Sequence, residues 1–149
     1  MLKKLLDWPP IWAVLSIGFV MLIAKLLPIF DVGKFYPTWI WIVIIAVGVI
    51  YLVWAEVEFL RAKTSVIPRR KPSKLITTGP FKISRNPIYT GFAMIIFGVA
   101  LKMGMLLGFL AVPIFVMIIQ RRFIADEEKA ILETFPDDAP KWFKKVNRW

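Results

Sequence analysis

The chain has 149 residues, 58% of them hydrophobic, and a formal net charge of +10. This hydrophobic share is above that of an ordinary soluble domain, and the length fits a single domain over residues 1–149. The sequence holds neither cysteine nor histidine, which excludes disulfides and thiol chemistry and removes the commonest general base and metal ligand. We therefore expect no metal site.

The apolar residues come in long blocks without the period of an amphipathic helix or strand, which is typical of membrane spans. The first block predicts a helix over about residues 11–30, long enough to cross a bilayer and too long for the core of a signal peptide. A second helix is predicted over about residues 38–60, with Trp39 and Trp41 near its start, where interfacial tryptophans are common.

A polar, proline-bearing segment follows over residues 61–87. It has no sustained apolar period, so we expect a loop with short turns. Glu56 and Glu58, just before it, indicate where the second helix leaves the bilayer.

Two further apolar blocks predict helices over about residues 88–102 and 105–135, joined by the tight turn "KMG" at 102–104. The first is short for an independent span, so the two are expected to form a hairpin that enters the membrane and returns. Pro113 predicts a kink in the second. The last part of that helix keeps apolar residues at helical spacing among charges, so we expect it to extend into water.

The remaining residues, 137–149, are basic and aromatic and fit a helix lying in the membrane interface. The predicted fold is therefore an all-α integral membrane protein. It has four transmembrane helices, a polar loop between the second and third, and a C-terminal helical extension.

The positions of the basic residues predict the orientation. Most of the 20 lysines and arginines lie before the first apolar block, in the central polar segment or after the last block. The positive-inside rule places these segments, and with them both termini and the candidate site, in the cytoplasm. Because this explains basic residues beside membrane spans, we expect no nucleic-acid partner.

The central loop and the segment after the fourth helix could together build a pocket over an opening in the membrane. The candidate side chains are Arg85, Asn86, Tyr89, Arg121, Arg122, Glu127 and Glu128. Each has a simpler reading: headgroup contact for the arginines, a helix start at Asn86, an interfacial anchor at Tyr89, and a solvated helix face for the glutamates. The sequence lacks the glycine-rich nucleotide motifs and the zinc-protease motif, so a Rossmann-type site is not expected.

Four ordered stretches favour the pocket: "TSVIP", "LITTGPFKISRNPIYTG", "RRFIADEEKAILETF" and "VNRW". Taken together, from about Trp54 to Trp149, they resemble the integral-membrane methyltransferases of the isoprenylcysteine carboxyl methyltransferase and phospholipid N-methyltransferase superfamily. The chain is similar to the short, prokaryotic type of member. The resemblance implies S-adenosylmethionine as methyl donor, S-adenosylhomocysteine as product, and a lipophilic acceptor reached from the membrane.

The resemblance also implies site residues. Those expected to bind the cofactor are Lys74, Leu75, Ile76, Gly79, Phe81, Arg85, Asn86, Pro87, Ile88, Tyr89, Glu127 and Glu128. Within this set Glu127 is expected to bind the donor's polar end. Arg121 and Arg122 are the expected catalytic residues, because in related enzymes an arginine just before the double glutamate faces the acceptor.

Departures from the family pattern bear on the acceptor. Asn86 replaces the histidine typical of the prenyl-protein branch, and "FP" at 135–136 replaces "FG". We favour carboxyl O-methylation of an isoprenylcysteine-like or other lipid-linked group, with phospholipid-type amine N-methylation as the other possibility. The alternative function is a non-catalytic lipid-binding or scaffold protein. A transporter fits less well, because four short helices without a charged pair give little path.

Overall fold

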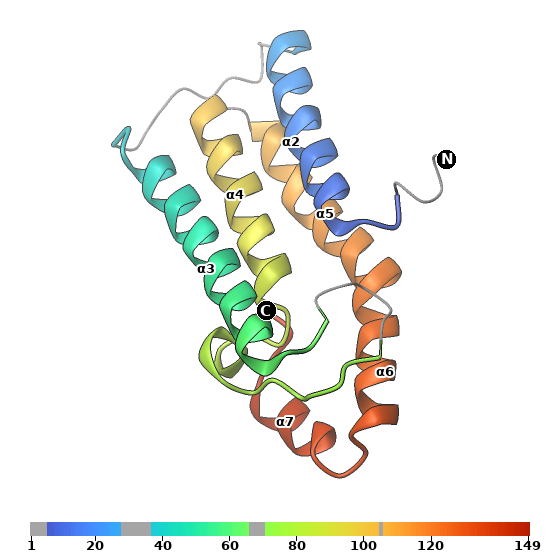
Figure 1. Cartoon of the computed structure of the whole chain (residues 1–149). Coiled ribbons are helices and arrows are strands. Elements are labelled where there is room, and N and C mark those ends of the chain that lie inside the picture. The colour runs from blue at the N-terminus through green and yellow to red at the C-terminus, as the bar shows by residue number, and fades with distance from the viewer. Residues whose placement is uncertain (1–5, 28–36, 66–70, 105) are drawn as a thin grey trace.

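A computed structural model describes residues 6–27, 37–65, 71–104 and 106–149, and within these ranges every regular element is helical. The α-helices, shown in Figure 1, are α2 (Pro9–Leu26), α3 (Ile40–Ala62), α4 (Pro87–Met103), α5 (Ala111–Ile119), α6 (Ala125–Thr134) and α7 (Ala139–Lys145). Two short 3-10 turns, Gly79–Lys82 and Leu106–Leu110, and a π-helical turn, Gln120–Ile124, complete them. The all-α prediction is confirmed for the described residues.

Three helices in the described part of the chain are long and apolar enough to cross a membrane. They are α2, α3 and the continuous helix Leu106–Thr134, with 18, 23 and 29 residues and mean hydropathies of 1.8, 2.4 and 1.8. The fourth apolar helix, α4, is shorter. The structure therefore supports a membrane protein with three candidate spans, and the four-span arrangement stays a prediction.

Helix α4 packs along α3, and glycines make the approach close. A Cβ atom on Gly91 of α4 would lie 2.8 Å from the Gly48 carbonyl oxygen of α3, and one on Gly98 would lie 2.6 Å from a side-chain carbon of Ile45. Small residues let helix backbones approach in this way in membrane proteins. The close approach at Gly91, near the start of α4, packs this part of the helix directly against α3.

The main core lies between α4, α5 and α2. Ile96, Phe115, Ile119 and Phe123 in this core have no exposed surface. Large apolar side chains of α2 and α3 point outward instead, among them Ile50 at 62% exposure. Such outward apolar faces suit lipid rather than water.

Element boundaries differ from the sequence prediction in detail. Helix α2 ends at Leu26 rather than at 30, and residues 28–30 of the predicted helix, with the segment 31–36 after it, lie outside the described residues. The predicted turn after α4 is present: Gly104 has φ 67°, and its N–H donates to Ala100 O and Leu101 O at 3.1 and 2.9 Å. Glycine adopts this left-handed conformation without strain.

The last long helix departs from α geometry on both sides of Pro113. This proline is the third residue of α5, with a 3-10 turn before the helix and the π-helical turn after it. A π-turn inserts one extra residue and rotates the faces that follow. The rotation sets which residues of α6 face the neighbouring helices.

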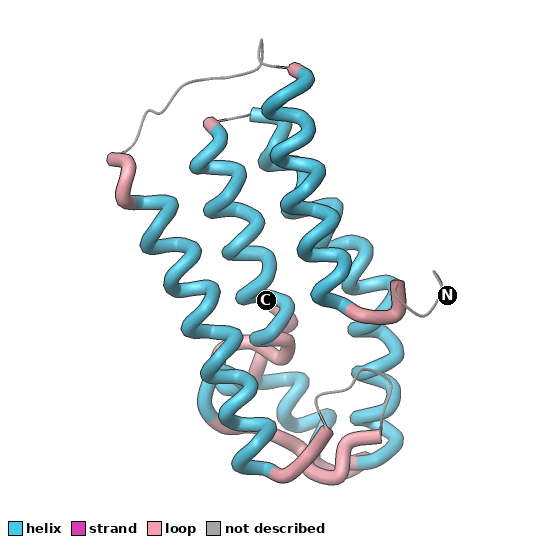
Figure 2. Tube along the Cα trace, turned by 45° about the horizontal axis from the view of Figure 1, so that its top comes forward, coloured by secondary structure: helices cyan, strands magenta, loops and turns pink. Residues whose placement is uncertain are grey.

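The C-terminal extension packs on the protein. Trp142 and Val146 are buried with Ala55, Ile76 and Phe81 in a second, smaller core. In Figure 2 most of the loop drawn in pink lies at one end of the bundle, the end at which α7 lies in Figure 1. The segment predicted to lie in the membrane interface therefore also forms part of the protein interior.

Candidate active site

A pocket opens at the end of the bundle where α7 lies. It is bounded by α4, α6, α7 and the segment that precedes α4. Its cavity has a volume of about 130 Å³, room for much more than one water molecule. The predicted cofactor-binding residues that line it are Lys74, Leu75, Ile76, Phe81, Arg85, Asn86, Pro87, Ile88, Tyr89, Glu127 and Glu128. The fold thus brings together side chains that lie more than fifty residues apart in the chain, from Lys74 to Glu128, while their binding role stays a prediction.

Gly79 does not line the pocket and has a different place. Its φ is 57°, and a Cβ atom there would lie 2.8 Å from Glu58 Cγ and 2.9 Å from Trp54 Nε1 of α3. Only glycine fits such a contact without displacing its neighbours. Gly79 therefore lets the 3-10 turn that carries Phe81 lie directly against α3.

A hydrogen bond also ties the start of the turn to α3: Thr78 Oγ1 donates to Glu58 Oε2. Within α3, Arg61 Nη1 donates to the other carboxylate oxygen, Glu58 Oε1, at 3.0 Å. Glu58 is only 7% exposed, so the glutamate that the sequence indicated as an exit from the bilayer is a buried acceptor. A buried carboxylate needs such partners to remain charged.

Asn86 and Pro87 begin α4. Pro87 is its first residue and Asn86 is in the N-cap position, but the Asn86 side chain makes no capping hydrogen bond. Instead its Nδ2 donates to the carbonyl of Arg148 at 3.3 Å, while its backbone N–H donates to Ser84 Oγ at 3.0 Å. Asn86 therefore joins the start of α4 to the segment after α7.

Tyr89 and Glu127 join the two helices that flank the pocket. Tyr89, on the first turn of α4, is 6% exposed, and its hydroxyl donates to Glu127 Oε1 of α6 at 2.6 Å. A phenol is protonated at neutral pH, so it can hold the carboxylate through a charge-assisted bond. The carboxylate of Glu127 is thereby oriented at the pocket wall.

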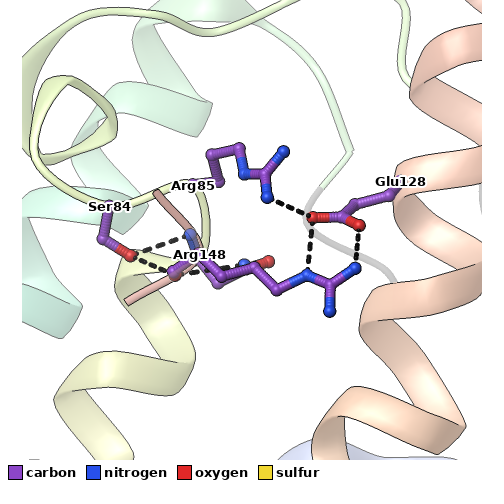
Figure 3. Close-up of polar contacts among 5 residues, drawn as sticks. Ser84, Arg85, Glu128 and Arg148 are labelled. Atoms are coloured by element: carbon purple, nitrogen blue, oxygen red, sulfur yellow. Dashed lines mark hydrogen bonds and ion pairs between the residues drawn. The ribbon is translucent and has the colours of Figure 1, made fainter. Parts of the chain in front are cut away.

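Glu128, the next residue, contacts two arginines. Arg85 Nη2 lies 3.2 Å from Glu128 Oε1, and Arg148 reaches both carboxylate oxygens, through Nε at 3.0 Å to Oε1 and through Nη2 to Oε2. Figure 3 shows the two guanidiniums approaching the same carboxylate from the loop and from the C-terminal segment. The hydrogen bond to Glu128 raises the pKa of Arg148, so its guanidinium stays charged at any physiological pH.

Arg121 and Arg122 lie on the π-turn, and neither lines the cavity. Both are exposed. Arg122 Nη2 is 3.7 Å from Asp7 Oδ1, and its guanidinium carbon is 5.3 Å from the centroid of the Trp12 ring. Arg122 therefore contacts the N-terminal part of the chain, and the catalytic assignment of both arginines stays a prediction.

Several pocket residues were not singled out from the sequence. Phe59 comes from the end of α3, Ile131 from α6, and Trp142 and Phe143 from α7. The Trp142 indole donates from Nε1 to the Phe81 carbonyl at 3.2 Å, and the Phe143 ring lies under Arg85. The aromatic character of the C-terminal segment was the signal, but it was assigned to the membrane interface.

The described residues include no group of three or more acidic or histidine side chains placed to hold a metal ion. What the pocket offers is a mixed lining. Apolar and aromatic side chains form most of it, with carboxylates and a guanidinium at defined places, which is the usual make-up of a small-molecule or cofactor site.

The fold defines a helical protein with three candidate membrane spans and a pocket at one end of its bundle. A family model described as phospholipid methyltransferase matches residues 36–138, more than half of the chain. The chain therefore belongs to the phospholipid methyltransferase family, which confirms the resemblance seen in the ordered motifs and implies a methyltransferase. No curated protein and no solved structure matches the chain.

Proposed function

We propose that the protein transfers a methyl group from S-adenosylmethionine, bound in the pocket, to a lipophilic acceptor that arrives from the membrane. The observation that carries this proposal is the meeting of the loop before α4, the start of α4 and the double glutamate of α6 around one cavity. These are the segments that the family resemblance implies for binding of the donor, and their meeting supports the proposal.

The lining suits the proposed donor. Leu75, Ile76 and Phe81 offer apolar surface for a nucleoside. Arg85 Nε is buried and has no hydrogen-bond partner among the described residues, and an unpartnered buried donor is costly unless a ligand supplies the acceptor. Glu127, oriented by Tyr89, offers a carboxylate for an ammonium or for hydroxyl groups. S-adenosylmethionine carries the matching groups: a nucleoside, a carboxylate, an ammonium and ribose hydroxyls.

S-adenosylmethionine supplies an electrophilic methyl group on a positively charged sulfur. Because methyl transfer is an in-line displacement that removes this charge, the protein needs to align two reactants rather than to stabilise an oxyanion. Tyr89 and Glu127 would fix the donor's polar end. Phe81, Trp142 and Phe143 would exclude water from the site. No histidine is available as a base. A carboxylate acceptor attacks the methyl group without losing a proton, whereas an ammonium acceptor would first give its proton to another base, such as a carboxylate or water.

The acceptor side is assigned to Arg121 and Arg122. A guanidinium can hold a carboxylate through two parallel hydrogen bonds and so orient it for attack, which supports carboxyl O-methylation. The family description supports amine N-methylation of a phospholipid. The two acceptors give different labelled products, an ester and a methylated amine, which base-catalysed hydrolysis separates.

The pocket end is proposed to face the cytoplasm. Exposed basic side chains gather on the loop and on α7, at Lys63, Lys71, Lys74, Lys82, Lys141, Lys144 and Lys145. The positive-inside rule favours this end on the cytoplasmic side.

Binding of S-adenosylhomocysteine to the purified protein, measured by calorimetry in detergent, tests the proposal at its first step. Saturable binding to one site is expected. A protein that binds no S-adenosylhomocysteine but does bind lipid would contradict the proposal and would instead favour a lipid-binding scaffold.

A further inference from the structure

Glu128 has two cationic partners. One carboxylate, 13% exposed, lies between the guanidinium of Arg85, 15% exposed, and that of Arg148, 39% exposed. The neighbouring carboxylate, Glu127, accepts from Tyr89 at 2.6 Å, so at Glu128 two guanidiniums share one carboxylate. Arg85, the more buried of the two, therefore shares its anionic partner, and an anionic ligand group would complete its pairing.

The two arginines share Glu128 unequally. Arg148 engages both carboxylate oxygens through Nε and Nη2, whereas Arg85 has one contact, from Nη2 at 3.2 Å. A two-bond contact is the stronger of the two. Arg85 Nε remains buried without a partner. Arg85 is therefore the cation with donor capacity left over, and it lines the cavity.

Both arginines are held in place by other contacts. The Arg85 guanidinium carbon lies 4.3 Å from the centroid of the Phe143 ring, a stacking that fixes its plane. The carbonyl of Arg148 accepts from Ser84 Oγ at 2.8 Å, and the Arg85 N–H donates to the Asn147 carbonyl at 2.9 Å. The loop and the C-terminal segment therefore form one unit (Figure 3).

We propose that Arg148 is a positioning residue, which occupies Glu128 so that Arg85 stays available to bind a carboxylate or phosphate group of the ligand in the pocket. Without Arg148, Glu128 would turn its charge to Arg85 and compete with that ligand. Arg148 lies outside the region that the family model matches, residues 36–138. The inference rests on the proposed function for the choice of probe.

The test is the affinity of the full chain for S-adenosylhomocysteine and for its decarboxylated analogue, which keeps the ammonium and the nucleoside. Arg148→Gln should weaken S-adenosylhomocysteine binding by about tenfold, the size of one charge-assisted hydrogen bond, and leave the analogue unchanged. The double variant Arg148→Gln with Glu128→Gln should regain most of the lost affinity, because the competing carboxylate is gone. Lys144→Gln, an exposed change on α7, controls for net charge.

A second probe, short-chain phosphatidic acid, separates the two sources of the anion. If Arg148→Gln weakens only the binding of this lipid, and the double variant restores it, Arg85 takes the acceptor's phosphate rather than the donor's carboxylate. The proposal is overturned if neither probe loses affinity, or if the double variant binds as weakly as Arg148→Gln, which is the result expected of a merely structural contact. Absence of S-adenosylhomocysteine binding in the unmodified protein would contradict the proposed function, while the lipid probe would still test Arg148.

Discussion

The hydroxyl of Tyr89 donates to Glu127 Oε1 across 2.6 Å and so joins the first turn of α4 to α6 at the wall of the pocket. The two residues are 38 positions apart in the chain. The bond makes the orientation of a carboxylate depend on a phenol from another helix.

Tyr89→Phe removes only the hydroxyl. Glu127 then loses its charge-assisted partner, and we expect S-adenosylhomocysteine to bind about three- to tenfold more weakly. Calorimetry measures the change. Tyr51→Phe is the matched control, because Tyr51 lies on α3 away from the pocket and contacts Trp54 edge to face. Equal affinity of Tyr89→Phe and the unmodified protein would contradict the role given to the hydroxyl.

Glu127→Gln keeps the size of the side chain and removes its charge. If the carboxylate binds the donor's polar end, affinity for S-adenosylhomocysteine should fall by at least about tenfold, with no comparable loss of thermal stability. Glu133→Gln, an exposed change on the same helix, should leave the affinity as it was. A variant that binds normally would remove Glu127 from the site.

Arg121→Gln separates the acceptor from the donor. Since Arg121 lies outside the cavity, its loss should leave S-adenosylhomocysteine binding unchanged and lower methyl transfer to a lipid extract by about tenfold or more. Lys129→Gln, also exposed and basic, serves as the control. Unchanged transfer would show that this arginine does not face the acceptor.

Gly91→Ala tests the close contact of α3 and α4. A Cβ atom there would lie 2.8 Å from the Gly48 carbonyl oxygen, and such overpacking costs about 1–3 kcal/mol of unfolding free energy. Gly18→Ala, on α2, has no atom within 4 Å of the new Cβ and should be neutral or slightly stabilising, because alanine favours the helix. Unfolding in mixed detergent compares the two, and equal stability would contradict the packing described for α4.

The predicted residues that line the cavity lie in short continuous stretches. The run from Arg85 to Tyr89 starts a helix at a proline, and a helix start fixes the directions of its first side chains. The pairing of Arg148 with Glu128 could not be predicted, because it joins segments that meet only when α7 packs on the loop. The burial of Glu58 depends on Gly79, whose positive φ brings the turn onto α3.

Arg122 shows a second limit of prediction from the sequence alone. A helical wheel assumes a constant period, and the π-turn Gln120–Ile124 breaks that period directly before the double glutamate. The side chain consequently lies beside Trp12 and Asp7. The spacing of charged residues in the sequence carries no sign of the extra residue, so the direction of this arginine could be learned only from the structure.

The most direct test of the central claim is methyl transfer itself. The purified protein is incubated with S-adenosylmethionine labelled in its methyl group and a membrane lipid extract, and the lipid phase is then counted and analysed. We predict label in a lipid product that depends on the protein and is strongly reduced by Glu127→Gln. A lipid phase that stays unlabelled with a protein that is folded and binds S-adenosylhomocysteine would contradict the lipophilic acceptor, and failure to bind S-adenosylhomocysteine as well would contradict the proposed activity.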